Sequence, residues 1–361
     1  MKRAKIIISS VLSVVIMIMC FASLNTSVLA EESDGFIYRV EGNSAILTGL
    51  DNSVSGEVVV PQKLDSYSVT VIDGAFMNRT DITKVILPEG LLRINAKSFY
   101  ACTGLASVYI PNSVTDIGEY AFQYCSSLTS VSLPSGMKRV KKGTFYECGS
   151  LSSIDIPENI SFIEQYAFYN TAYYKNTDNW DSGVIYVGKH LLQAKTYVAG
   201  TYEIRQDTKS ISDYAFNSCL SLTAIIINKE LKTVGESVCY NCKNLTDIYY
   251  SGTFNDRRKI VTGKDNQKFN NATWHYKQYQ PGDINGDDEV NNKDVVRLFR
   301  YLSGWSVEVE TTTLDVNGDN SVNNKDYTRL FQYLSGWSVE VFSENPSGTI
   351  GGDDYGPVVH F

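Results

Sequence analysis

Large apolar residues recur along the middle of the chain at a constant interval of 23 residues. The positions that share it are Phe76, Phe99, Phe122, Phe145 and Phe168, and after a longer gap Phe216 and Cys239. Four prolines keep the same interval, at Pro88, Pro111, Pro134 and Pro157. A constant period of this length indicates a repeat protein in which each repeat forms one coil of a solenoid.

Each repeat also predicts where its strand lies. In the repeat that begins at Phe122, apolar and polar residues alternate from Leu128 to Leu133, as in a strand with one buried face. Pro134 follows, where it ends the backbone hydrogen-bond ladder. One coil has too few apolar side chains to offset the conformational entropy of its backbone, so neighbouring coils must stack to fold.

The repeat pattern I-x4-F-x5-L-x2-V-x-I-P resembles the leucine-rich repeats of the BspA-like group of bacterial surface proteins, from about Gly35 to Tyr276. The resemblance implies an α/β-type leucine-rich-repeat solenoid with short parallel strands and an irregular or short helical convex side. It implies an amino-terminal cap at 31–69, a solenoid at 70–278 and a closing cap at 248–278. Residues 171–210 are expected to form an irregular coil, because Phe168 and Phe216 lie two periods plus two residues apart, and Val184 to Leu192 predicts a hairpin.

A second pattern is written twice, 32 residues apart, beginning at Asp283 and at Asp315. In each copy, apolar residues at i, i+3 and i+7 predict an amphipathic helix: Val295, Leu298 and Leu302, then Tyr327, Leu330 and Leu334. Gly304 and Gly336 end these helices. No full helix precedes the first copy, because Pro281 and Gly282 stand before it. Each copy is therefore half of a helix–loop–helix unit, and we expect the two halves to pair.

The start of each copy has the oxygen-donor spacing of an EF-hand loop, with ligands at positions 1, 3, 5, 7, 9 and 12. The candidate ligands are Asp283, Asn285, Asp287, Glu289, Asn291 and Asp294, and Asp315, Asn317, Asp319, Ser321, Asn323 and Asp326; Glu289 and Ser321 contribute backbone carbonyls. Position 12 is Asp rather than Glu, and Asp288 and Asn320 replace the usual glycine. Hard oxygen donors select calcium, so two calcium ions are predicted, with ion binding and local folding coupled.

These two copies resemble the dockerin module, which implies a small all-α calcium-binding domain at 279–342. The resemblance implies a partner, the cohesin domain of a scaffoldin in a cellulosome-like, polysaccharide-degrading complex. The implied cohesin contacts are Asn292, Lys293, Phe299, Arg300 and Gly304, and Asn324, Lys325, Phe331, Gln332 and Gly336. Phe299 and Phe331 are candidates either for the partner surface or for the core. Because the copies are nearly identical, a dual binding mode is predicted.

Composition and the first residues bear on location. The chain has 361 residues and a net charge of −8, which makes nucleic acid an unsuitable partner. A basic start, an apolar run from Ile6 to Leu24 and a small-residue site predict a signal peptide at 1–30, cleaved after Ala30. A retained anchor, or a lipid on Cys20, is the alternative. We expect a secreted, extracellular protein without a membrane span, attached to a cell-surface or released multi-enzyme complex, with a flexible tail at 343–361.

Cysteines and histidines do not form an evident active site. Five cysteines share one repeat position and are either packed thiols or bridged between adjacent coils: Cys102, Cys125, Cys148, Cys219 and Cys242. The repeat also accounts for the Cys239–Cys242 pair, which needs no redox or zinc site. The three histidines, His190, His275 and His360, are scattered, so no catalytic residues are assigned and the chain is predicted not to be an enzyme.

The strand face of the solenoid is the predicted ligand surface. Its outward positions include Lys84, Tyr109, Asp155, Asp247 and Tyr249. Small polar residues with few aromatics favour an unknown protein or surface ligand. The alternatives are a carbohydrate-binding accessory that targets the complex to plant polysaccharide, a spacer, and an enzyme with an unrecognised site.

Overall fold

The computed structural model describes residues 31–252, 254–276, 282–287, 289–309, 313–319 and 321–337. The predicted leader at 1–30 and the tail at 343–361 lie outside these ranges, as do Asp288 and Asn320. Contacts divide the chain into two compact units. The first extends to Ile248 and includes Ile260–Thr273, and the second contains Tyr249–Lys259 and the residues from Trp274 onward.

An antiparallel meander opens the first unit, at the position of the predicted cap. It consists of β1 (Glu31–Ser33), β2 (Phe36–Glu41) and β3 (Ser44–Leu50), and β3 then pairs in parallel with β6 (Tyr67–Ile72). β5 (Lys63–Leu64) pairs antiparallel with β6, and β4 (Gly56–Val59) begins a second column of strands. The meander covers the apolar end of the stack, where the side chain of Tyr38 is fully buried.

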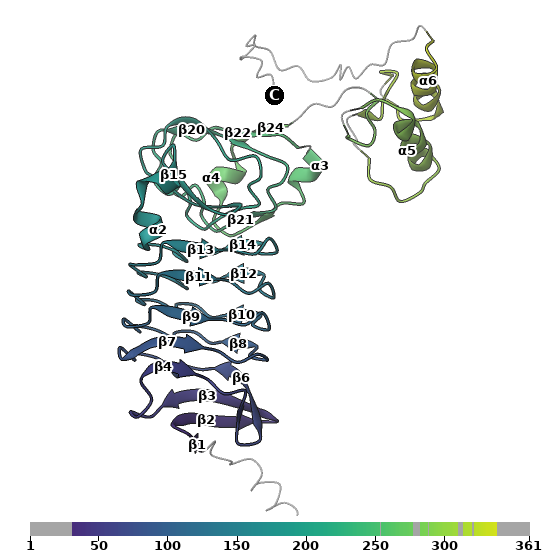
Figure 1. Ribbon diagram of the computed structural model, residues 1–361. Coiled ribbons are helices and arrows are strands. Elements are labelled where there is room, and N and C mark those ends of the chain that lie inside the picture. The colour runs from purple at the N-terminus through teal and green to yellow at the C-terminus, as the bar shows by residue number, and fades with distance from the viewer. Residues whose placement is uncertain are drawn as a thin grey trace, which may run out of the picture. The chain divides into compact units, whose positions relative to one another are not determined.

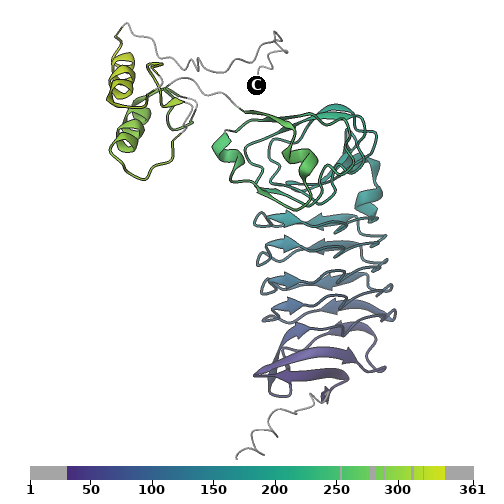
Figure 2. The same cartoon turned by 180° about the vertical axis from the view of Figure 1, so that it is seen from behind.

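Regular coils follow, and each contributes two short strands (Figures 1 and 2). One column contains β7 (Ile82–Ile86), β9 (Ser107–Tyr109), β11 (Ser130–Ser132) and β13 (Ser153–Asp155), and the other contains β8 (Arg93–Ile94), β10 (Asp116–Ile117), β12 (Arg139–Val140) and β14 (Phe162–Ile163). Within each column the paired strands are parallel with the 23-residue register, as between Ser132 and Asp155, and β9 and β11, like β10 and β12, belong to separate sheets. The predicted strand is confirmed but shorter, because the amide of Leu128 bonds within a turn to the Cys125 carbonyl.

Stacked phenylalanines form the centre of the regular coils. The rings of Phe76, Phe99, Phe122, Phe145 and Phe168 lie nearly parallel, with successive centroids 4.6, 4.8, 5.3 and 5.4 Å apart. All five side chains are buried. Each ring therefore packs against its counterparts in the adjacent coils, so residues 23 positions apart in the sequence are in contact in the structure.

The cysteines beside these rings are free, buried thiols. Each Sγ donates a hydrogen bond to a carbonyl of the preceding coil, and for Cys102, Cys125 and Cys148 the acceptors are Phe76, Phe99 and Phe122, at 2.8, 3.1 and 3.0 Å. Cys242 repeats the contact with the Phe216 carbonyl at 2.9 Å. Each of these carbonyls also accepts a hydrogen bond from an amide of its own turn, as Phe76 does from Arg79 at 3.1 Å, so the thiol adds a second bond that links adjacent coils.

The irregular coil contains the predicted hairpin. β16 (Val184–Val187) pairs antiparallel with β17 (His190–Ala194), after α2 (Ala172–Lys175), the 3-10 helix η1 (Thr177–Asn179) and β15 (Trp180–Asp181). Strands β15, β16, β17, β19 (Ser210–Ile211), β21 (Thr233–Val234) and β23 (Val261–Thr262) form one sheet. The other sheet runs β18 (Gly200–Glu203), β20 (Leu222–Ile227), β22 (Asp247–Tyr250) and β24 (Thr273–Tyr276). Two short helices, α3 (Phe254–Arg257) and α4 (Gln267–Asn270), lie between β22 and β24 in the sequence.

The second unit contains the two predicted amphipathic helices, α5 (Asn292–Leu302) and α6 (Asn324–Leu334). Both halves share one core, made of Ile284, Val295, Leu298, Leu314, Val316 and Leu330. Each helix begins with the same capping box, in which Asn291 pairs with Asp294 and Asn323 with Asp326. Two half-units bury one apolar cluster between them, so the expectation that the halves pair is confirmed.

Candidate metal and partner site

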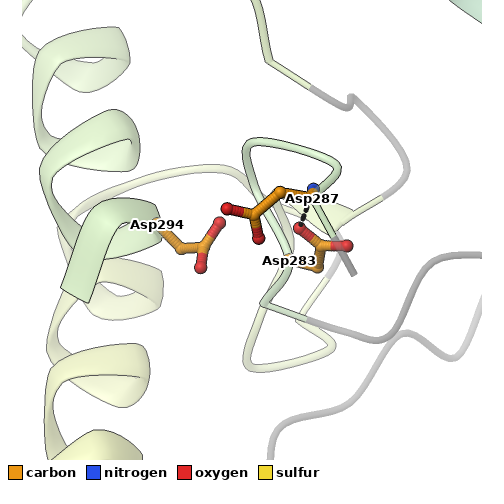
Figure 3. A group of neighbouring side chains, drawn as sticks. All are labelled: Asp283, Asp287 and Asp294. Carbon is orange, nitrogen blue, oxygen red and sulfur yellow. Dashed lines mark hydrogen bonds between the residues drawn. The ribbon is translucent and has the colours of Figure 1, made fainter. Parts of the chain in front are cut away.

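The first loop brings three acidic side chains together. Carboxylate oxygens of Asp283, Asp287 and Asp294 all lie within 4.8 Å of one another (Figure 3). Asp283 and Asp287 come from the loop, and Asp294 comes from the first turn of α5. Asp283 and Asp294 are buried, whereas Asp287 is exposed. Within the described ranges, no other His, Cys, Asp or Glu side chains form such a cluster.

Backbone amides hold these carboxylates in place. Asp283 Oδ1 accepts hydrogen bonds from the amides of Gly286 and Asp287, at 2.9 and 3.1 Å. The two oxygens of Asp294 accept from the amides of Asn285 and Asn291, at 2.9 and 2.8 Å. The loop therefore folds around its first and last acidic residues, and their carboxylates close it into a ring.

The second loop repeats this network. Asp315 Oδ1 accepts from the amides of Gly318 and Asp319, at 2.9 and 3.1 Å. Asp326 accepts from the amides of Asn317 and Asn323, at 3.1 and 2.8 Å, and burial raises the pKa of its carboxyl group. The amide-to-carboxylate network is therefore the same in both loops, whereas among the described residues only the carboxylates of the first loop all approach one another within 4.8 Å.

Lysine side chains partly balance the loop charge. Lys293 Nζ lies 3.0 Å from Asp287 Oδ2, and its hydrogen bond lowers the pKa of that carboxyl group. Lys325 Nζ lies 3.6 Å from Asp319 Oδ2 in the second loop. Both lysines belong to the implied cohesin contacts, so a candidate partner residue touches a candidate calcium ligand in each half.

The donor set fits a hard divalent cation. The clustered side chains offer carboxylate oxygens, with an amide oxygen from Asn285 or Asn317 and a carbonyl from Glu289 or Ser321 nearby in sequence. Oxygen-only sets of this kind suit calcium. Asn291 and Asn323 are candidate calcium ligands and also cap the helices. Their side-chain oxygens accept hydrogen bonds from the amides of Lys293 and Lys325.

The residues implied to contact cohesin lie on α5 and α6, except for Gly304 and Gly336, which follow the ends of the two helices. Asn292, Lys293, Phe299, Arg300, Gly304, Asn324, Lys325, Phe331 and Gly336 are exposed, and Gln332 is half-buried. Phe299 and Phe331 are 53% and 54% exposed, so they are surface residues and not part of the core. The ring of Tyr327 lies 5.8 Å from the first and 6.4 Å from the second.

The predicted strand-face residues lie along the coils and do not converge on one point. Lys84 pairs with Glu57 at 3.3 Å, and the Tyr109 hydroxyl donates to Glu89 at 2.8 Å. Asp155 accepts from Ser132 at 2.8 Å, and Asp247 accepts from Thr246 at 2.6 Å. Tyr249 is 40% exposed, and its ring stacks on that of His275.

A row of tyrosines lies on the turns that follow β8, β10, β12 and β14, and the 23-residue spacing did not predict it as a site. Its members touch ring to ring across the coils, as Tyr124 touches Tyr146 with centroids 6.1 Å apart. Their offsets from the phenylalanine rung differ, since Tyr124 follows Phe122 by two residues and Tyr166 precedes Phe168 by two. A search for aromatic residues on both sides of the rung is the signal that finds them.

Comparisons with known proteins support both halves of this description. A family model described as the BspA type leucine rich repeat region matches residues 69–199 and 181–260, in 6 copies. A model of the dockerin type I domain matches residues 281–335. No curated protein matches the chain.

Several solved structures resemble the chain. A leucine rich cell surface protein from Faecalibacterium prausnitzii is 19% identical with a TM-score of 0.36, covering 64% of this chain and 97% of that one. A leucine rich repeat protein from T. pallidum is 18% identical, with a TM-score of 0.35 and coverages of 65% and 86%. The pneumococcal vaccine antigen PcpA is 13% identical, with a TM-score of 0.37 and coverages of 70% and 89%.

In the part of the chain that the structure describes, no helix is both long enough and apolar enough to cross a bilayer. The 23-residue repeats, their parallel strands and the family match agree with one another over more than half of the sequence. The chain therefore belongs to the family of BspA-type leucine-rich-repeat proteins, and it carries a dockerin type I domain at residues 281–335.

Proposed function

We propose that this chain is a secreted, non-catalytic binding subunit that docks, through its calcium-loaded dockerin, to a scaffoldin cohesin in a cellulosome-like, polysaccharide-degrading complex. The observation that carries the proposal is the duplicated loop network, in which each first and last acidic residue closes its loop at the start of an exposed helix. Dockerin type I domains bind calcium. The dockerin match adds the cohesin partner.

Each loop of the dockerin holds one calcium ion in this proposal. The ligands are Asp283, Asn285, Asp287, Glu289, Asn291 and Asp294 in one loop, and Asp315, Asn317, Asp319, Ser321, Asn323 and Asp326 in the other. The ion neutralises carboxylates that otherwise repel one another, and it fixes the first turn of the following helix. Calcium therefore holds the exposed faces of α5 and α6 in the shape that the cohesin recognises.

The cohesin surface is formed by the exposed residues of one copy at a time. Phe299 with Arg300, or Phe331 with Gln332, supplies the centre, since an exposed aromatic ring beside a polar or charged group is typical of an interface hot spot. The near-identity of the copies lets either face the partner after a half-turn.

The test is cohesin binding by the full chain, measured by titration calorimetry with calcium and with a chelator. Binding is expected only with calcium. Phe299→Ser and Phe331→Ser are each expected to keep most of the affinity, and the double variant to lose it. Tyr301→Ser is the matched control, because Tyr301 is 39% exposed on the same helix but lies outside the contact set. Total loss from one single variant would exclude the dual mode, and calcium-independent binding would overturn the proposal.

In this proposal the repeat domain binds a protein or surface ligand. The binding surface is the strand face, which contains Lys84, Tyr109, Asp155, Asp247 and Tyr249. A second candidate function, a carbohydrate-binding accessory that brings the complex to plant polysaccharide, is favoured by the tyrosine row. Pull-down of the full chain on insoluble cellulose and hemicellulose, in chelator and without cohesin, separates the two. Retention abolished by changing Tyr109 and Tyr249 would contradict a protein ligand on the strand face.

A further inference from the structure

Aromatic side chains form one continuous series of ring contacts along the turns that follow β8, β10, β12 and β14 and into the irregular coil. The series, here called the tyrosine edge, contains Tyr100, Tyr124, Tyr146, Tyr166, Tyr169, Tyr174 and Trp180. Centroid separations from one ring to the next lie between 4.9 and 6.1 Å. At least one ring comes from each successive coil, so the edge runs along the stacking direction of the solenoid.

The middle of the tyrosine edge is open to solvent. Tyr124 is 39% exposed and Tyr166 is 43% exposed, while Tyr146 and Tyr169 are half-buried beside them. Cations cover the two ends, because Lys97 Nζ lies 6.0 Å from the Tyr100 ring and Lys195 Nζ lies 3.7 Å from the Trp180 ring.

The phenol hydroxyls of this edge are largely unused by the protein. Among the described residues, the hydroxyls of Tyr100, Tyr124, Tyr146, Tyr166 and Tyr169 make no hydrogen bond to another protein group, whereas Tyr174 donates to Gln193 at 2.7 Å. The edge therefore offers apolar ring faces and free hydroxyls side by side.

The backbone under the exposed rings is strained. Tyr124 and Tyr166 have φ values of 63° and 61°, in the left-handed region that penalises a bulky side chain. The same conformation recurs at the equivalent positions of other coils, which carry Ala101, Glu147 and Asn170 at the first and Lys97, Tyr120 and Gly143 at the second. The conformation therefore belongs to the turn of the repeat, where Asn and Gly fit with the least strain and a tyrosine is not required.

The edge ends at a narrow cleft where the irregular coil interrupts the regular turns. Tyr166, Tyr169, Tyr174 and Tyr214 line the cleft, together with Asp213 and Gln193. Its volume of about 50 Å³ is too small for a sugar ring and sufficient for one small exocyclic group. The carboxylate of Asp213 is already bonded to the amides of Gln165 and Glu236, at 3.0 and 2.7 Å. A ligand would therefore lie across the rings and extend only a side group into the cleft.

We propose that the tyrosine edge binds an extended, neutral polysaccharide chain that lies along the coils. A pyranose ring has an apolar C–H face and a rim of hydroxyls, and the edge offers both ring surfaces and phenol hydroxyls, with neighbouring rings turned against one another, as Tyr124 and Tyr146 are by 88°. Between residues 100 and 180 the exposed large apolar side chains are all tyrosines, namely Tyr109, Tyr124 and Tyr166. No large aliphatic side chain of this described stretch is exposed, so the apolar surface that it offers consists of aromatic rings.

This site gives the carbohydrate alternative a surface of its own, separate from the strand face. Affinity gel electrophoresis of the full chain tests it, with hydroxyethylcellulose, mixed-linkage β-glucan, xyloglucan and arabinoxylan in the gel, and polygalacturonate as the anionic comparison. The gels contain chelator and no cohesin, so failure of the docking proposal does not affect the result. At least one neutral polysaccharide is expected to retard the chain, and polygalacturonate is not.

The variants remove the rings without adding strain. Tyr124→Asn and Tyr166→Gly reproduce the residues that other coils carry, so the double variant is expected to keep or raise the thermal midpoint and to weaken retardation at least tenfold. Tyr197→Asn, which removes a 71% exposed tyrosine that belongs to neither the tyrosine edge nor the strand-face set, is the matched control and is expected to bind normally. Absence of retardation of the unaltered chain would overturn the proposal. So would retardation that Tyr197→Asn weakens and the double variant does not.

Discussion

Acidification is expected to destabilise the repeat domain through one buried histidine. The ring of His190 is 3% exposed, and its Nδ1 lies 2.8 Å from Ser210 Oγ. Burial, with a smaller contribution from Lys209, lowers the pKa of His190 from 6.5 to about 4. In the folded chain the imidazole therefore stays neutral at pH values where it is protonated in the unfolded chain.

The sign and size of the effect follow from proton linkage. Between pH 6.5 and about pH 4 the unfolded state binds one more proton at this residue than the folded state, so the free energy of unfolding falls as pH falls. The two pKa values give a loss of about 2 kcal/mol at pH 5 and about 3 kcal/mol once both states are protonated. A loss of this size is a large share of the stability of an ordinary domain.

Urea unfolding followed by circular dichroism, at pH 7 and pH 5, measures this loss. The unaltered chain is compared with His190→Gln, which keeps a polar side chain and cannot be protonated in this range. Carboxylates and the other histidines titrate in both proteins, so their contributions cancel in the difference. The unaltered chain is expected to lose about 2 kcal/mol more than the variant. Equal losses in the two proteins would refute the reasoning.

Other predictions test the coils and the loops. Phe122→Ala removes a fully buried ring stacked between two others, and it should lower the free energy of urea unfolding by about 3–5 kcal/mol; a loss below about 1 kcal/mol would count against the stack. Gly143→Ala should cost roughly 1–2 kcal/mol, because φ is +60°, and its Cβ would also meet Tyr120 Cε1 at 2.3 Å. In the double variant Gly143→Ala/Tyr120→Ser, the steric cost of the new Cβ should disappear and the backbone cost at φ +60° should remain, so the two losses of unfolding free energy should not add. Strictly additive losses would exclude the clash. Chelation should remove the helical circular-dichroism signal of α5 and α6, and calcium at a hundredfold excess over its Kd should add about 2.7 kcal/mol of stability for each ion bound; a spectrum unchanged by chelator would contradict coupled folding.

The fold was predictable wherever one residue type recurs at one repeat position. The step from Phe99 to Phe122 gave the register of the strands, because a parallel stack places equivalent residues next to each other. The antiparallel arrangement of β1, β2 and β3 has no periodic counterpart, so the sequence predicted a cap and not its topology. The carbonyl groups that accept hydrogen bonds from the thiols could not be predicted from the sequence either. They depend on which turn carbonyl of the preceding coil lies beside the sulfur.

The candidate site divides in the same way. EF-hand spacing predicted a cluster containing Asp283, Asp287 and Asp294, because fixed loop positions define the ligands. The pairing of Lys293 with Asp287 across six residues depends on the closed shape of the loop. The exposure of Phe299 depends on which side of α5 faces α6, and helical spacing alone left that open. Features set by local spacing were therefore predictable, and those set by folded proximity were not.

The buried thiols give individual coils a chemical reporter of their own. Cys102, Cys125 and Cys148 lie in successive coils and are at most 1% exposed. A hydrogen bond with Cys125 and burial raise the pKa of Cys102, which keeps its sulfur in the unreactive protonated form. A maleimide can therefore alkylate each cysteine only after its own coil has opened. Labelling rates measured cysteine by cysteine would show the order in which the coils separate, without any engineered probe.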